Sequence, residues 1–97
     1  MAGSKSHDDT ARKIAKKFGA EYNKGPGADI KAKKFAIEIE TENTINDASR
    51  QLQGYKKPVY VAPTTNTGIE KALKKYKNTT IGVMDKTGTI IKKSKRK

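Results

Sequence analysis

The sequence predicts an α/β protein in which a mixed β-sheet is flanked by helices. Three observations predict this class. Apolar side chains recur at helical spacing in three segments, apolar and charged side chains alternate around Ile37, and one short segment, 59–62, is continuously apolar. Strands that alternate with helices in the second half predict parallel pairing there, and the short turns of the first half predict an antiparallel meander.

The first helix is predicted from Ser6 to Phe18. Ser6 is a suitable N-cap, with Asp9 three residues later in a pattern like a capping box, and Gly19 is a typical helix end. The apolar stripe consists of Ala11, Ile14, Ala15 and Phe18. We expect His7 to be exposed near the helix start.

Three short strands are expected next. Glu21 and Tyr22 form the first, and the segment 24–27 is a turn-rich loop before a strand that opens at Asp29. Lys33 and Lys34 form the turn into a third strand, where Phe35, Ile37 and Ile39 alternate with Ala36, Glu38 and Glu40.

The second half alternates helices and strands. Apolar spacing predicts helices over 45–55 and 69–76, each preceded by a capping-box pattern, Thr44 to Asp47 and Thr67 to Glu70. Pro58 ends the first of these helices, and the apolar segment 59–62 is typical of a central strand. A strand over 81–84, a hairpin turn over 85–88 and a final edge strand at 90–91 complete the order.

Composition limits the chain to one small, basic domain. The 97 residues carry 22 Lys and Arg against 10 Asp and Glu, a net charge of +12, and only 33% are hydrophobic, so the core must be thin. We expect a loose N-terminus over 1–5, a single domain over 6–91 and a basic tail over 92–97. Without that tail seventeen basic and ten acidic residues remain, a net charge of +7, so the body itself attracts a polyanion.

The charge favours nucleic acid as the partner, with an anionic membrane surface or ribosomal RNA as alternatives. The sequence has no apolar run that would span a membrane and no signal-peptide segment, and we expect a cytoplasmic protein. The absence of cysteine excludes disulfides and thiolate metal sites, and one histidine cannot form a His-rich site. Any metal must therefore be a hard cation bound by oxygen atoms, Mg²⁺ or Mn²⁺.

Acidic residues gather in one stretch of this basic chain. Four of the ten acids are Asp29, Glu38, Glu40 and Glu42. Glu38 and Glu40 project to the same side of their strand, and like charges held together cost energy unless a cation neutralises them. The alternative is a solvated strand face on which the glutamates lie opposite lysines.

The spacing of these acids resembles the signature of the PD-(D/E)xK nuclease superfamily. The matching residues are Asp29, then Glu38-Ile39-Glu40, with Glu40 at the position that usually holds Lys. Some restriction endonucleases also have Glu there. The resemblance implies an αβββαβ restriction-endonuclease-like core, with Mg²⁺ or Mn²⁺ bound by Asp29, Glu38 and the carbonyl group of Ile39. It implies that Glu40 binds a second ion or orients the water, and that Lys31 or Lys33 replaces the missing lysine.

Two further features resemble branches of the same superfamily. Gln51 and Tyr55 form a Gln-x-x-x-Tyr motif similar to that of RecB-like nucleases, where the motif lies beside the active site, and Gln51 would contact DNA or the surroundings of the metal. The alternative is a core role for Tyr55 and a surface role for Gln51. Archaeal Holliday-junction resolvases and Mrr-type enzymes have a similar layout, with an acid at the start of the first helix. Asp8 or Asp9 would correspond, unless these acids only complement the helix dipole.

The sequence therefore predicts a metal-dependent DNA endonuclease that recognises duplex or branched DNA by shape, because no recognition-helix or zinc-finger motif is present. The resemblance implies a homodimer, since two active sites are needed to cut both strands. The expected nucleic-acid contacts are Arg12, Lys13, Lys16, Lys24, Lys31, Lys33, Arg50 and Tyr55. The alternatives are a catalytically inactive DNA-binding protein on the same fold, and an unrelated basic nucleic-acid-binding protein.

Overall fold

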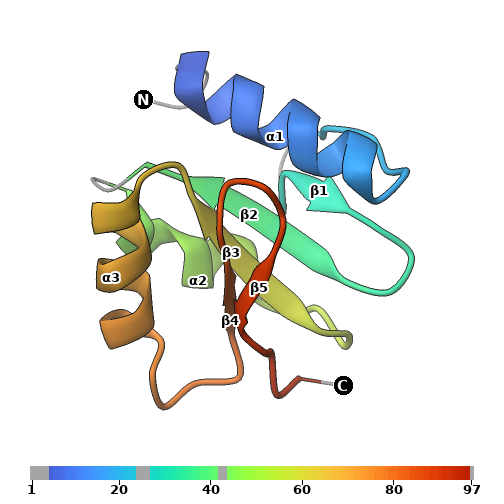
Figure 1. The fold of residues 1–97 in the computed structure, drawn as a ribbon. Helices are drawn as coiled ribbons and strands as arrows, with labels where there is room; N and C mark the ends of the chain where they lie inside the picture. The colour runs from blue at the N-terminus through green and yellow to red at the C-terminus, as the bar shows by residue number, and fades with distance from the viewer. Residues whose placement is uncertain (1–4, 24–26, 42–43, 97) are drawn as a thin grey trace.

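A computed structural model describes residues 5–23, 27–41 and 44–96, and it is an α/β fold built on a five-stranded mixed sheet (Figure 1). The elements, in chain order, are α1 (Lys5–Lys17), β1 (Ile30–Lys31), β2 (Ala36–Glu40), the 3-10 turn η1 (Ile45–Asp47), α2 (Ala48–Gln51), β3 (Val59–Pro63), α3 (Asn66–Lys75), β4 (Gly82–Met84) and β5 (Ile90–Lys92). This confirms the predicted class of a mixed sheet flanked by helices.

The strands lie in the sheet in their chain order, from β1 to β5. β1 pairs with β2 antiparallel, β2 with β3 and β3 with β4 parallel, and β4 with β5 antiparallel. Parallel neighbours need a crossover connection, and α2 and α3 provide these two connections. The strand expected at Glu21 and Tyr22 is reduced to a single antiparallel bridge between Tyr22 and Ile30.

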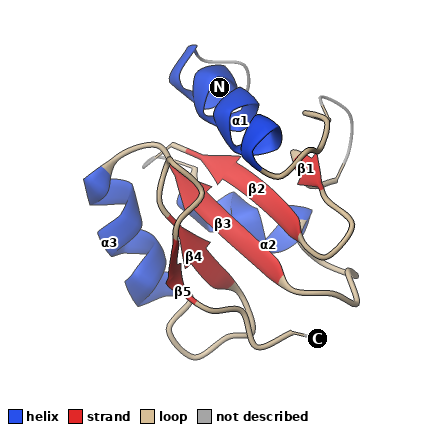
Figure 2. Ribbon diagram, turned by 45° about the vertical axis from the view of Figure 1, so that its right-hand side comes forward, coloured by secondary structure: helices blue, strands red, loops and turns tan. Residues whose placement is uncertain are grey.

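The two faces of the sheet are covered by different helices (Figure 2). Strand alternation sends Ile37 and Ile39 toward α1, where they pack with Ala11 and Ile14, and sends Ala36 to the opposite face, which α2 and α3 cover. β3 contributes side chains to both cores and is buried along its whole length, as the sequence predicted. By the same alternation Glu38 and Glu40 lie on the face of α2 and α3.

The helix starts differ from the capping patterns. α3 begins after Thr65, whose side chain accepts a hydrogen bond from the N–H of Gly68, and not at the predicted Thr67. Thr44 does not cap α2 either, because its hydroxyl bonds the N–H of Thr41 and the carboxylate of Glu40 instead. α2 is a single turn rather than the predicted helix over 45–55. Within the described residues, no helix is long and apolar enough to cross a membrane.

The basic C-terminal segment is packed against the domain as far as Arg96. Ser94 is buried, and its hydroxyl accepts a hydrogen bond from the N–H of Val59 and donates one to the carbonyl of Thr80. Arg96 Nη1 donates to the carbonyl groups of Leu52 and Tyr55, which follow α2. These contacts tie the end of the sheet to the loop between α2 and β3.

Candidate active site

Two hydrogen bonds from backbone N–H groups join Asp29 to Glu38 and to the next residue, Ile39. Asp29 immediately precedes β1, and its Oδ2 accepts the N–H of Ile39 at 2.9 Å. Its own N–H donates to Glu38 Oε1 at 3.1 Å. The antiparallel pairing of β1 with β2 brings the start of one strand beside the end of the other, so two acids nine residues apart meet at one edge. The predicted pair is therefore assembled by the sheet itself.

Glu38 and Glu40 are both buried, each with only 6% of its surface exposed. Burial, followed by the charges of Asp29 and Glu40, raises the pKa of Glu38 to about 9. Burial also raises the pKa of Glu40 to about 7, although the hydroxyl of Thr44 donates to Glu40 Oε1 and opposes this rise. The alternative of a solvated strand face is therefore wrong.

His7 is a site residue that sequence reasoning placed at the surface. It is only 7% exposed, its Nε2 lies 3.1 Å from Asp29 Oδ2, and its Nδ1 lies 3.0 Å from the hydroxyl of Tyr22. Tyr22 donates to Asp8 Oδ1 at 2.7 Å. The hydrogen bond with Asp29 raises the pKa of His7 despite the opposing effect of burial. The expectation of an exposed His7 is therefore wrong.

The missed signal was helical spacing. His7 lies four and seven residues before Ala11 and Ile14, so it continues the apolar stripe of α1 and must face the sheet. The same geometry separates the two acids at the helix start. Asp8 reaches the site through Tyr22, whereas Asp9 is exposed.

The oxygen atoms at this edge fit a hard cation. Asp29 Oδ2 accepts the N–H of Ile39 and lies within hydrogen-bond distance of His7 Nε2. Glu40 Oε2 is buried and has no hydrogen-bond partner among the described residues. In the described segments no group of three His, Asp or Glu side chains is arranged to hold a metal. The expected ligand set needs only two carboxylates and a carbonyl, and two buried acids with raised pKa values are the arrangement that a cation relieves.

Gln51 and Tyr55 line one hollow with Gly27, Arg50 and Gly54. They are not on one helix, because α2 ends at Gln51 and Gly54 adopts a positive φ of 86°. The predicted one-turn spacing is therefore wrong. The motif still reaches the site, since the hydroxyl of Tyr55 accepts the N–H of Ala28, the residue before Asp29.

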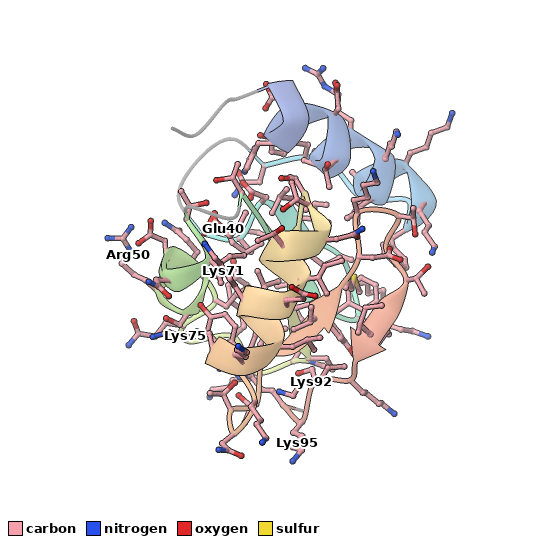
Figure 3. The ribbon with its side chains drawn as sticks, turned by 60° about the vertical axis from the view of Figure 1, so that its left-hand side comes forward. Glu40, Arg50, Lys71, Lys75, Lys92 and Lys95 are labelled. Carbon is pink, nitrogen blue, oxygen red and sulfur yellow. The ribbon has the colours of Figure 1, made fainter. Side chains whose placement is uncertain are left out.

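The predicted basic contacts divide between separate places. Arg12, Lys13 and Lys16 lie on the exposed face of α1, while Lys33 lies in the turn between β1 and β2. Lys24, like the acid Glu42, falls outside the described residues. Figure 3 shows the predicted contact Arg50 on the side of α2 and α3, where four lysines that were not predicted also lie: Lys71, Lys75, Lys92 and Lys95.

The candidate site combines carboxyl groups at two neighbouring strands with a histidine from α1. It consists of Asp29 beside the start of β1, the buried carboxyl groups of Glu38 and Glu40 on β2, and His7 from the covering helix. Comparison of the chain with family models, with curated proteins and with solved structures returns no match.

Proposed function

We propose that the protein is a metal-dependent DNA endonuclease of the PD-(D/E)xK type that hydrolyses phosphodiester bonds. The observation that carries this proposal is the edge where burial and the charge of Asp29 raise the pKa values of Glu38 and Glu40, in a chain of net charge +12. A structural core has no need of such acids, and burying them without a cation costs stability. A divalent ion at this edge accounts for the buried acids, and a polyanionic substrate on the surface accounts for the net positive charge.

The order of elements supports the same proposal. A helix, a bridge at Tyr22, the antiparallel pair β1 and β2, a helical crossover and the parallel strand β3 follow the αβββαβ order. The first of the three strands is reduced to one bridge. The acids lie where the second and third strands of that order meet.

Each residue of the site has a distinct task in this proposal. When bound, the divalent ion activates water and offsets charge on the phosphate. Asp29 and Glu38 would hold the ion, together with the carbonyl of Ile39. The N–H of Ile39 and the ring of His7 fix the position of Asp29 through Oδ2. Glu40 has a pKa of about 7 and an unpartnered Oε2, so it is suited to take a proton from the attacking water near neutral pH.

A DNA-binding protein without catalysis is the second candidate. Glu40 at the position that usually holds Lys favours it, because a negative group there cannot stabilise charge on the phosphate as an ammonium does. On this reading Glu38 keeps its proton at neutral pH, in line with its raised pKa, and the basic surface alone binds DNA.

Cleavage of labelled branched, single-stranded and linear duplex DNA, with Mg²⁺, Mn²⁺ or EDTA, separates the two candidates. D29N and E38Q keep the size of each side chain, and E70Q removes an acid from the exposed surface of α3 as the matched control. The nuclease proposal expects cutting that requires the ion, disappears in D29N and E38Q and persists in E70Q. Salt-sensitive binding without cutting in the parent protein would leave the second candidate.

A further inference from the structure

Next to the acidic edge lies a cluster of opposite character, centred on Tyr55. The N–H of Ala28 donates to the hydroxyl of Tyr55 at 3.2 Å, and the following N–H, that of Asp29, donates to Glu38 Oε1 at 3.1 Å. Two consecutive backbone groups therefore join the Tyr55 hydroxyl to the candidate metal ligands. Whatever binds at Tyr55 lies beside the acids.

Gly27 lies where two side chains of this cluster come close to the backbone. Its φ is +92°, and a Cβ there would lie 3.0 Å from the Tyr55 hydroxyl and 3.3 Å from Lys31 Nζ. The ammonium of Lys31 and the hydroxyl of Tyr55 thus converge over bare backbone. Lys31 has no ion-pair partner among the described residues, and strand alternation turns it away from α1, since Ile30 before it packs on that side.

Two further cations lie near Tyr55. Arg50 lines the same hollow as Gly27 and Tyr55, and its pair with Asp47 is long, at 3.9 Å, and exposed, so the guanidinium is held only weakly. Lys57 Nζ lies 5.9 Å from the centre of the Tyr55 ring and donates to the carbonyl of Ala32. The positive charge is thus gathered around one tyrosine.

These groups have the chemistry of a phosphate site. The Tyr55 hydroxyl accepts a hydrogen bond from Ala28, so its own proton is available to a ligand oxygen. An ammonium and a guanidinium provide charge-assisted donors, and such contacts to phosphate carry no base preference. We propose that the Tyr55 cluster, meaning Gly27, Lys31, Arg50, Tyr55 and Lys57, binds a backbone phosphate of a nucleic-acid strand. The identity of this phosphate as the neighbour of the cleaved one rests on the proposed nuclease function, whereas the binding itself does not.

Of the two candidate lysines, Lys31 lies beside Tyr55 and Lys33 does not. Lys33 and Lys34 line a separate hollow with Phe18 and Phe35 at the turn between β1 and β2. K34Q is therefore a matched control for K31Q, since both remove one exposed positive charge from the same hairpin.

The test is binding of a fluorescently labelled single-stranded oligonucleotide in EDTA, followed by anisotropy over a range of salt concentrations. K31Q should weaken binding roughly fivefold and lower the salt slope by about one, and Y55F should weaken binding several-fold at an unchanged salt slope. K34Q should change affinity less than K31Q. Unchanged affinity and salt slope in K31Q, together with parental affinity in Y55F, would overturn the proposal, with the unfolding free energy of each variant measured as a check on folding.

Two further experiments distinguish this proposal from the nuclease proposal and from binding of free phosphate. DNA cleavage in Mg²⁺ is measured on the same variants. A parent protein that cuts nothing, while K31Q and Y55F still lose affinity, removes the nuclease proposal and supports the phosphate site. If D29N abolishes cutting while K31Q and Y55F behave as the parent, the result supports the nuclease proposal and removes the phosphate site. In the other experiment inorganic phosphate replaces the oligonucleotide. A response to phosphate that needs Lys31, with oligonucleotide affinity independent of Lys31, would assign the site to free phosphate and overturn the nucleic-acid assignment.

Discussion

Glu38 makes the stability of the metal-free protein depend on pH. The ordinary pKa of this carboxyl is 4.5, and burial with the neighbouring charges raises it to about 9 in the folded state. A raised pKa stabilises the folded state fully below pH 4.5, and that contribution is lost as the pH rises toward 9. We therefore expect the unfolding free energy of the protein in EDTA to fall between pH 5 and pH 8.

The size of this fall in unfolding free energy follows from the change in the pKa of Glu38 on folding. Between the two pKa values the unfolded chain releases one proton that the folded protein keeps, which costs about 1.4 kcal/mol per pH unit. Over three units the loss from Glu38 is about 4 kcal/mol, a large part of the stability of a small domain. E38Q keeps an acceptor for the N–H of Asp29 but cannot ionise, so it should be the more stable protein at pH 8.

Denaturant unfolding at pH 5, 6, 7 and 8, followed by circular dichroism in EDTA, measures this. The E38Q curve should be flatter than that of the parent, most clearly above pH 7, while E70Q should run parallel to the parent. A slope should remain in E38Q below pH 7, because the pKa of Glu40, raised to about 7, and the raised pKa of His7 also give stability that is lost as the pH rises. An E38Q curve as steep as that of the parent would refute the reasoning that Glu38 is buried among other carboxylates.

Three other predictions follow from the site and the packing. Mg²⁺ should raise the thermal midpoint of the parent protein at pH 8 and not that of D29N, and equal shifts in both would argue against a metal site at Asp29. H7A should lower the unfolding free energy by about 1 to 3 kcal/mol, because it removes a buried ring and its hydrogen bonds with Asp29 and Tyr22, and a change near zero in denaturant unfolding would contradict the bond to Asp29. G82A should destabilise more than G54A in the same assay, since a Cβ at Gly82 would lie 2.5 Å from the carbonyl oxygen of Lys92, whereas one at Gly54 would add only the strain of its φ of +86° and meet nothing within 4 Å.

The strands were predictable because alternation is a local signal. Ile37 and Ile39 against Glu38 and Glu40 define two faces without any knowledge of the rest of the chain, and the apolar run after Pro58 marks the central strand. The meeting of Asp29 with Glu38 followed from the same logic, since a short turn must bring the two strands together antiparallel.

The misjudged features depend on contacts between distant parts of the chain. Thr44 and Asp47 have the spacing of a capping box. The hydroxyl of Thr44 nevertheless bonds to Glu40 and to the N–H of Thr41 rather than to a helix N–H group. The burial of His7 needs both α1 and the bridge at Tyr22, 15 residues away. Glu38 and Glu40 look like surface residues in the sequence, and only the helical cover on their face removes them from water.

The C-terminal segment described above has a consequence for the order in which the protein folds. Val59 begins β3, but its N–H donates to Ser94, which follows 35 residues later in the chain. The carbonyl of Leu52 likewise accepts a hydrogen bond from Arg96, 44 residues later. During synthesis from the N-terminus, the loop that carries Tyr55 is therefore made well before the residues that fasten it. We expect this loop to be among the last parts to become ordered, so that a ribosome-bound chain stalled before Ser94 keeps it open to proteases.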